Sequence, residues 1–210
     1  MTSDAIAVVK HFATESNILL GHSYGTAVVA RVNRALSASR NIDCIVLISG
    51  ADSLPSGGHP IFMLPVFVLQ CLEPYLSSEF VRLAFSESTA QELKQECIAV
   101  NAKNDTHVCR CFYRQMEWAT PRDWECIRCP FLILHGEDDK LIPIRKSEAL
   151  YRTLTFHASQ EILSKSSFHR ILYAGHQVHQ EKAEDLRLLL ADFIIQNTRH
   201  RGEDHGFTHS

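Results

Sequence analysis

The stretch NILLGHSYGTAVVA, residues 17–30, decides the fold of this chain. Its first part, Asn17–Leu20, is a compact apolar run that ends at Gly21, which is typical of a buried parallel strand. From Tyr24 to Leu36 the apolar residues recur at helical spacing instead. A tight turn at Ser23 must therefore join a strand to a helix. The G-x-S-x-G pattern around this serine fits such a turn, in which the hydroxyl is held in a strained conformation that points away from the sheet.

Further strands and helices alternate along the chain. Short apolar runs predict three more strands, at Cys44–Ile48, Phe131–Leu134 and Arg170–Tyr173. The spacing of apolar residues predicts further helices at Asp4–Ala13, Arg145–Leu154 and Gln180–Gln196. Strands that alternate with helices in this way form a parallel sheet with helices on both faces, so we expect an α/β fold.

The segment between the second and third predicted strands differs from the rest. Residues 54–121 contain no strand-like run, but amphipathic pieces such as Glu79–Phe85 and Ser88–Ala99 predict a mostly helical insertion that lids a site. Residues 199–210 are polar and rich in His and Gly, so we expect a disordered tail there. The remaining residues, 1–198, are expected to form one domain.

The composition of the chain excludes some functions. Its 210 residues are 45% apolar and 21% charged, as in a soluble globular protein, and a net charge of −3 offers no basic face to nucleic acid. The N-terminus lacks the pattern of a signal peptide. The longest apolar stretch, Ile61–Leu72, is too short to span a bilayer, although its composition suits peripheral contact with a membrane. An odd count of seven cysteines indicates reduced thiols and a cytoplasmic or organelle-facing location.

Two later segments supply candidate partners for Ser23. A serine hydroxyl at neutral pH needs a base to take its proton, and the base needs a carboxylate to hold its ring. The third predicted strand runs into the acidic loop HGEDDKLIP, residues 135–143, and His176 follows the fourth predicted strand. The carboxyl ends of parallel strands meet at one edge of the sheet, where such folds bind ligands. We therefore expect the hydroxyl, a carboxylate and the imidazole to converge at that edge.

Together these motifs resemble those of the α/β-hydrolase family, over roughly residues 17–197. Members of the family commonly show a strand followed by H-G-x-x-D-x-x-x-P, which implies Asp139 as the acid, with Asp138 as the alternative. The base of the family lies in a G-H pair before the last helix, which implies His176, with His179 as the alternative. The chain order of nucleophile, acid and base also agrees with that of the family.

The resemblance implies a serine hydrolase that cleaves carboxylic esters, lipid or acylglycerol esters above all, through an acyl-enzyme. Ser23 would be the nucleophile, His176 the general base and Asp139 the residue that orients the imidazole, without a cofactor or a metal. The N–H of Tyr24 would provide one half of the oxyanion hole. A serine nucleophile argues against the dehalogenases and epoxide hydrolases of the family, which resemble one another in using aspartate.

The resemblance also implies parts that this sequence does not contain. The complete fold of the family has strands that precede the nucleophile strand, and a loop after one of them supplies the second oxyanion donor. We therefore expect the C-terminal part of the fold only, with an open, apolar edge that invites aggregation or a protein partner. Loss of one oxyanion donor costs about 100- to 1000-fold in rate, so we expect the chain alone to be inactive or nearly so.

Three rival interpretations remain. The pairs Cys109/Cys111 and Cys126/Cys129 have spacings that suit a thiolate zinc site, but their places in a helical segment and beside a buried strand favour ordinary thiols. An H-x-x-x-x-D signature of acyl transfer is absent, because Glu181 stands five residues after His176. The second functional hypothesis is a non-catalytic scaffold that keeps the triad residues and acts through protein contacts.

Overall fold

A four-stranded parallel sheet forms the centre of the molecule. The computed structural model describes residues 1–37, 42–54 and 60–198. In the described chain the strand order is β1-β2-β3-β4, with Leu20 beside Val46, Val46 beside Leu132 and Leu132 beside Ser167. This confirms the predicted α/β class with its parallel sheet. The strands are β1 (Ile18–His22), β2 (Cys44–Ile48), β3 (Phe131–Gly136) and β4 (Ser167–Ile171).

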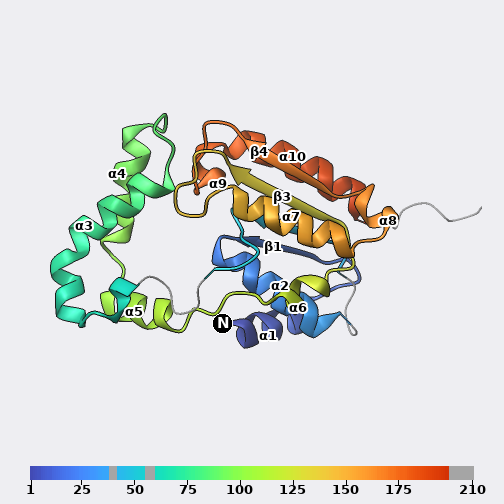
Figure 1. The fold of residues 1–210 in the computed structure, drawn as a ribbon, viewed down its shortest axis with the longest axis horizontal. Helices are drawn as coiled ribbons and strands as arrows, with labels where there is room; N and C mark the ends of the chain where they lie inside the picture. The colour runs from blue at the N-terminus through green and yellow to red at the C-terminus, as the bar shows by residue number, and fades with distance from the viewer. Residues whose placement is uncertain (38–41, 55–59, 199–210) are drawn as a thin grey trace, which may run out of the picture.

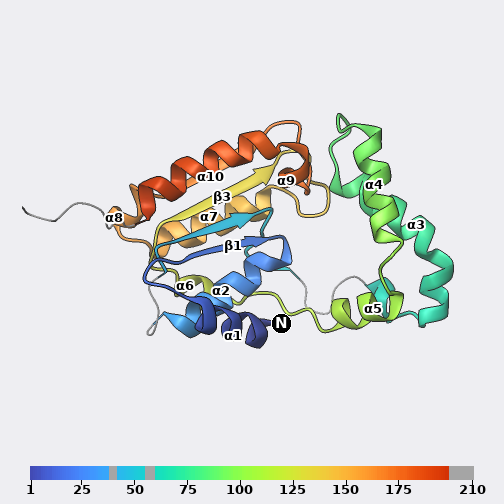
Figure 2. The ribbon, with the colours of Figure 1, turned by 180° about the vertical axis from the view of Figure 1, so that it is seen from behind.

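Helices cover both faces of this sheet (Figures 1 and 2). The side chains of β2 show why, because they alternate between two apolar clusters: Ile45 and Leu47 pack on one side, and Val46 and Ile48 on the other. The first cluster is completed by α1 (Thr2–Phe12), α2 (Tyr24–Leu36), α6 (Pro121–Glu125), α7 (Arg145–His157) and α8 (Gln160–Leu163). The second is completed by α9 (Val178–Glu181) and α10 (Ala183–Asn197).

The segment between β2 and β3 leaves the sheet and folds as helices at one end of the molecule (Figure 1). Its longest helix, α3, begins 13 residues before the predicted piece at 79–85, because the helix continues through Pro74. Proline lacks the N–H of a helical bond, so Pro74 interrupts the helical pattern of the sequence. The described elements away from the sheet are η1 (Pro60–Met63), α3 (Val66–Ala84), α4 (Gln91–Asn101) and α5 (Thr106–Arg114), and α6 then packs on the sheet again.

The C-terminal elements differ from the prediction in their bounds. The fourth strand lies at 167–171 rather than 170–173, and Leu172 and Tyr173 are exposed, with Tyr173 at φ 55°. The last helix is interrupted at Lys182, whose φ of −135° and ψ of 47° separate α9 from α10. Residues 199–210, for which a disordered tail is predicted, lie outside the described residues.

Strand β1 lies at one edge of the sheet as far as the structure describes the chain. Its side chain at Leu20 is 50% exposed, whereas the residues of β2 are all buried. The edge is therefore apolar and open in the described residues, a feature that favours pairing with another strand. Every helix in the described ranges is too short or too polar to cross a bilayer.

Candidate active site

Ser23 occupies the sharp turn between β1 and α2. Its φ of 55° and ψ of −124° lie in a region that residues other than glycine rarely adopt, which costs about 1–3 kcal/mol. Two sets of hydrogen bonds hold this conformation: the N–H of Ser23 donates to the carbonyl of Ile48 at 2.9 Å, and Thr26 donates to the carbonyl of Ser23 from its N–H and its hydroxyl. The turn is thereby fixed to the carboxyl end of β2.

The two glycines of the motif have different roles. A Cβ on Gly21 would lie 2.5 Å from the carbonyl oxygen of Gly25, so β1 and α2 can approach each other only because residue 21 has no side chain. A Cβ on Gly25, by contrast, would meet no atom within 4 Å. The close approach of strand and helix therefore depends on Gly21.

Asp139 is buried at the carboxyl end of β3. Its Oδ1 accepts hydrogen bonds from the backbone N–H groups of Leu141 and Ile142 at 2.9 and 2.8 Å, which fixes the loop around it. Its Oδ2 lies 2.8 Å from Nδ1 of His176 and 3.2 Å from Nε2 of His135. Burial alone would raise the pKa of this carboxyl, but the hydrogen bonds from the two histidines outweigh burial and lower the pKa to about 2. The carboxylate is therefore ionised at neutral pH.

His176 lies in the loop between β4 and α9 and is buried. The contact with Asp139 engages Nδ1, so the proton of a neutral ring lies on Nδ1 and Nε2 is free to act as a base. The carbonyl of His176 accepts hydrogen bonds from Nε2 of His22 at 2.9 Å and from the hydroxyl of Ser49 at 3.1 Å. The centroid of the His22 ring lies 4.9 Å from that of His176, so the residue before Ser23 packs against the His176 ring.

The structure distinguishes the sequence alternatives by their contacts. Asp138 accepts a hydrogen bond from the hydroxyl of Ser86, whereas Asp139 contacts the imidazole of His176. His179 is exposed and packs against the ring of His22 at 4.7 Å. Among these alternatives, the carboxylate and the imidazole that bond to each other are those of Asp139 and His176.

His135 is a supporting residue that sequence reasoning placed near the site without a role. It is fully buried, and its Nε2 faces two acceptors, the carbonyl of Ile142 at 2.8 Å and Oδ2 of Asp139. Its Nδ1 lies 2.7 Å from the hydroxyl of Ser147. The ring therefore contacts the same carboxylate oxygen of Asp139 as His176 does. Its position four residues before Asp139, in the motif that ends β3, was the available signal.

Tyr24 is the first residue of α2, where a backbone N–H has no partner within the helix. Such an N–H lies at the positive end of the helix dipole and suits a developing negative charge. The ring of Tyr24 packs against Phe112 of α5 and against Trp118, each at 5.7 Å between centroids. A cavity of about 630 Å³ opens beside this ring, lined among others by Arg31, Phe112, Arg114 and Met116.

Comparison with known proteins places the chain in a family. The sequence model of the family described as serine aminopeptidase, S33, matches residues 1–174. The chain belongs to this α/β-hydrolase family. Protein ABHD8 of Homo sapiens is 28% identical over 204 residues, in an alignment that covers 93% of this chain and 43% of ABHD8. The chain therefore spans less than half the length of the curated relatives first matched.

Solved structures of other α/β-hydrolases share the fold. The hydrolase olei00960 from Oleispira antarctica has a TM-score of 0.73 at 17% identity and covers 93% of this chain and 71% of its own. An esterase from Exiguobacterium antarcticum has a TM-score of 0.69 at 16% identity, over 93% and 72% of the two chains. At these identities the likeness establishes the fold, and the chemistry must be argued from the side chains of this chain.

The cysteines do not assemble into a metal site. Within residues 1–37, 42–54 and 60–198, no group of three or more His, Cys, Asp or Glu side chains is placed to hold a metal ion. Cys109 and Cys111 are two residues apart on α5, so their side chains point in different directions. Burial raises the pKa of Cys129 to about 12, which keeps this thiol protonated.

Proposed function

We infer that the chain carries the triad of a serine ester hydrolase, with Ser23 as nucleophile, His176 as general base and Asp139 as the acid that orients the ring. The observation that carries this proposal is the buried hydrogen bond between Asp139 and Nδ1 of His176, formed beside the strained turn of Ser23. A hydroxyl, an imidazole and an ionised carboxylate at one edge of a parallel sheet are the groups that acyl transfer needs.

Acylation of Ser23 is the first step of the proposed reaction. As Oγ forms a bond to the ester carbonyl carbon, its proton moves to Nε2 of His176. The negative charge of Asp139 stabilises the imidazolium that results, and the N–H of Tyr24 donates to the oxygen on which charge develops. The bond to the alcohol oxygen then breaks, and this oxygen takes the proton from His176.

Deacylation repeats the same proton movements with water. Nε2 of His176 takes one proton from water as the oxygen attacks the acyl carbon, and the proton then returns to Oγ of Ser23 when the carboxylic acid leaves. The turn at Ser23 holds Oγ in place through both steps, because its backbone is bonded to Ile48 and Thr26. Ser23, His176 and Asp139 together carry out the proton transfers of both steps.

The proposed substrate class is a carboxylic ester with an apolar acyl chain, such as a lipid or acylglycerol ester. Two aromatic rings support it: Tyr24, the residue after Ser23, packs against Phe112 of the helical insertion, and both line the cavity whose rim also carries Arg31 and Arg114. Phe62 stacks on Tyr113 at 4.1 Å and extends this aromatic surface toward η1. A series of p-nitrophenyl esters from acetate to palmitate tests the class: rates that rise with chain length support it, and a fall beyond butyrate contradicts it.

A fluorophosphonate probe, which reacts only with an activated serine, tests the triad itself. We expect slow labelling of the 210-residue chain, because the N–H of Tyr24 is the single oxyanion donor proposed here, and loss of this labelling in Ser23→Ala and His176→Ala. His179→Ala is the matched control, because His179 lies three residues after His176, on α9, and also touches His22; this variant should label at nearly the rate of the unchanged chain. A folded chain without any labelling would overturn the proposal and favour a non-catalytic scaffold.

A further inference from the structure

Glu181 joins two segments that are far apart in the sequence. Its Oε2 accepts a hydrogen bond from the backbone N–H of Gly175 at 2.8 Å, and its Oε1 accepts one from the backbone N–H of Ser86 at 2.8 Å. The hydroxyl of Thr89 donates to the same Oε1. Gly175 directly precedes the proposed base, whereas the two other donors follow the end of α3. Residues 172–177, between β4 and α9, carry His176 and are called the base loop. One half-buried carboxylate thus connects the base loop to the helical insertion.

The end of α3 also contacts the base loop directly. The carbonyl of Ala84 accepts hydrogen bonds from the N–H groups of His176 at 2.7 Å and Gln177 at 3.3 Å. A Cβ on Gly175 would lie 2.5 Å from that same carbonyl oxygen. The backbone of the loop packs so closely against the end of α3 that no side chain fits at position 175, and the residue there must be glycine.

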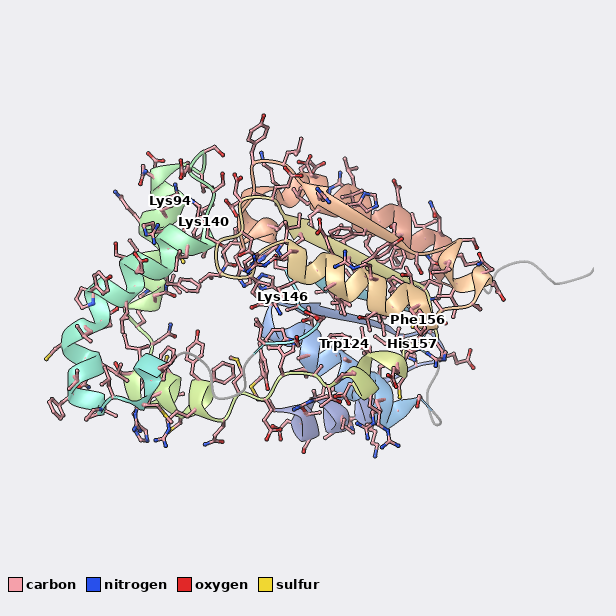
Figure 3. The ribbon with its side chains drawn as sticks, viewed as in Figure 1. Lys94, Trp124, Lys140, Lys146, Phe156 and His157 are labelled. Atoms are coloured by element: carbon pink, nitrogen blue, oxygen red, sulfur yellow. The ribbon has the colours of Figure 1, made fainter. Side chains whose placement is uncertain are left out.

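The loop that carries Asp139, residues 137–144 and called the acid loop, is also attached to the end of α3. The N–H of Lys140 donates to the carbonyl of Leu83 at 3.2 Å, and the hydroxyl of Ser86 donates to Asp138. Lys140 also pairs with the carboxylate of Glu87 at 2.9 Å, while Lys94 of α4 donates to the carbonyl of Glu87. Figure 3 labels both lysines, each of which bonds to Glu87. Residues 83–89 therefore hold the acid loop and the base loop together.

We propose that Glu181 is a positioning residue for the reaction proposed above: by bonding Gly175 to the end of α3, it sets the place of the His176 ring between Asp139 and Ser23. The inference rests on the proposed function. A carboxylate suits this task because both of its oxygens accept, so it serves donors on two sides at once. A glutamine could keep the bonds at one oxygen, but its NH₂ group would face the donor at the other.

The size of the expected effect follows from the geometry of proton transfer. A shift of about 1 Å between reacting groups costs on the order of 100-fold in rate. Glu181 contacts the backbone one residue from the base, so its loss shifts the imidazole without removing it. Glu181→Gln should therefore lower the labelling rate per folded molecule, and kcat, by about 10- to 100-fold with KM changed less than about twofold.

The matched control is Glu184→Gln. Glu184 stands three residues later and pairs with Arg187 in solvent, with no contact to the base loop. This variant should label at the rate of the unchanged chain. A Glu181→Gln chain that labels at the unchanged rate while folded would overturn the inference. Should that variant fail to fold, Thr89→Val removes one donor to Glu181 and keeps the shape of the side chain; it should label severalfold more slowly, and an unchanged rate contradicts the proposal.

A second measurement separates this inference from the proposed function. Amide hydrogen exchange reports the bonds of Glu181 whether or not the chain is an enzyme. Glu181→Gln should accelerate exchange at Gly175 and should move the imidazole resonances of His176 in NMR spectra. If the unchanged chain does not label, the proposed function fails, and the NMR result still decides the role of Glu181. Unmoved His176 resonances in Glu181→Gln would overturn the inference even in an active enzyme.

Discussion

Nε2 of His22 lies 2.9 Å from the carbonyl oxygen of His176, so a hydrogen bond joins the residue before the candidate nucleophile to the candidate base. Both residues stand at carboxyl ends of the sheet, although they are 154 positions apart in the sequence. The hydroxyl of Ser49, at the end of β2, donates to the same carbonyl. Two strand ends thus hold the backbone of the base, and the hydrogen bond to Asp139 holds its ring.

The contacts of the two neighbouring aspartates predict very different effects of their removal. Asp139→Asn places an amide where the ionised carboxylate accepts from Nδ1 of His176, and an amide NH₂ there favours the wrong tautomer. We expect kcat to fall by about 10³- to 10⁴-fold in p-nitrophenyl ester hydrolysis. Asp138→Asn keeps an acceptor for the hydroxyl of Ser86 and should cost less than about tenfold. Equal losses in the two variants would contradict the assignment of the acid.

The two glycines of the nucleophile turn form a second matched pair. Gly21→Ala puts a Cβ 2.5 Å from the backbone of Gly25, so strand and helix must separate. We expect the free energy of unfolding to fall by about 1–3 kcal/mol, as measured in urea. Gly25→Ala meets no atom within 4 Å and lies in α2, where alanine is favoured over glycine by about 1 kcal/mol. Its stability should be unchanged or higher, and a loss equal to that of Gly21→Ala would refute the assigned roles.

The sequence predicts the buried elements well and the edges of the fold less well. Strand β2 and helix α2 begin and end where the pattern places them, because an uninterrupted apolar run and a helical period leave one interpretation. Strand β4 is displaced by three residues at its start, since it lies at the edge and carries polar side chains such as His169 and Arg170. Helix α3 was underestimated because Pro74 interrupts its pattern.

The candidate site likewise contains residues that the sequence predicts and residues that it does not. Ser23, Asp139 and His176 could be predicted because each belongs to a short motif at the end of a strand. The roles of His135 and Glu181 could not, because their partners are backbone groups and side chains of segments that only the tertiary fold brings together. A pattern along one sequence contains no signal for such contacts.

Removal of the His135 ring should show how much this ring stabilises the buried carboxylate of Asp139. His135→Leu leaves Oδ2 of Asp139 with one donor fewer in a buried place, which costs about 1–3 kcal/mol in the free energy of unfolding at pH 7. His135→Gln offers an N–H at nearly the position of Nε2, so it should recover part of that loss. Urea denaturation of both variants measures the difference, and equal stabilities would show that the donor at Nε2, which faces both Asp139 and the carbonyl of Ile142, contributes nothing.

The lowered pKa of His22 predicts how the free energy of unfolding depends on pH. Burial lowers the pKa of His22 from 6.5 to about 4, with the nearby His176 and His179 adding to the effect and the hydrogen bond to His176 opposing it. The unfolded chain therefore binds a proton at higher pH than the folded chain, so the contribution of His22 to stability is complete above pH 6.5 and is lost as the pH falls toward 4. The corresponding window of Asp139, from 3.8 to about 2, lies below this range.

His22→Gln removes the titration and keeps an N–H donor for the carbonyl of His176. The free energy of unfolding of this variant should change less between pH 7.5 and 4.5 than that of the unchanged chain, whose slope from this one group reaches at most about 1.4 kcal/mol per pH unit. Burial also lowers the pKa of His179, so His179→Gln is measured beside it and should flatten the slope less, because its shift is smaller. Identical slopes in His22→Gln and the unchanged chain would show that this ring is free to take a proton in the folded protein, and that its hydrogen bond to the base loop does not depend on the neutral form.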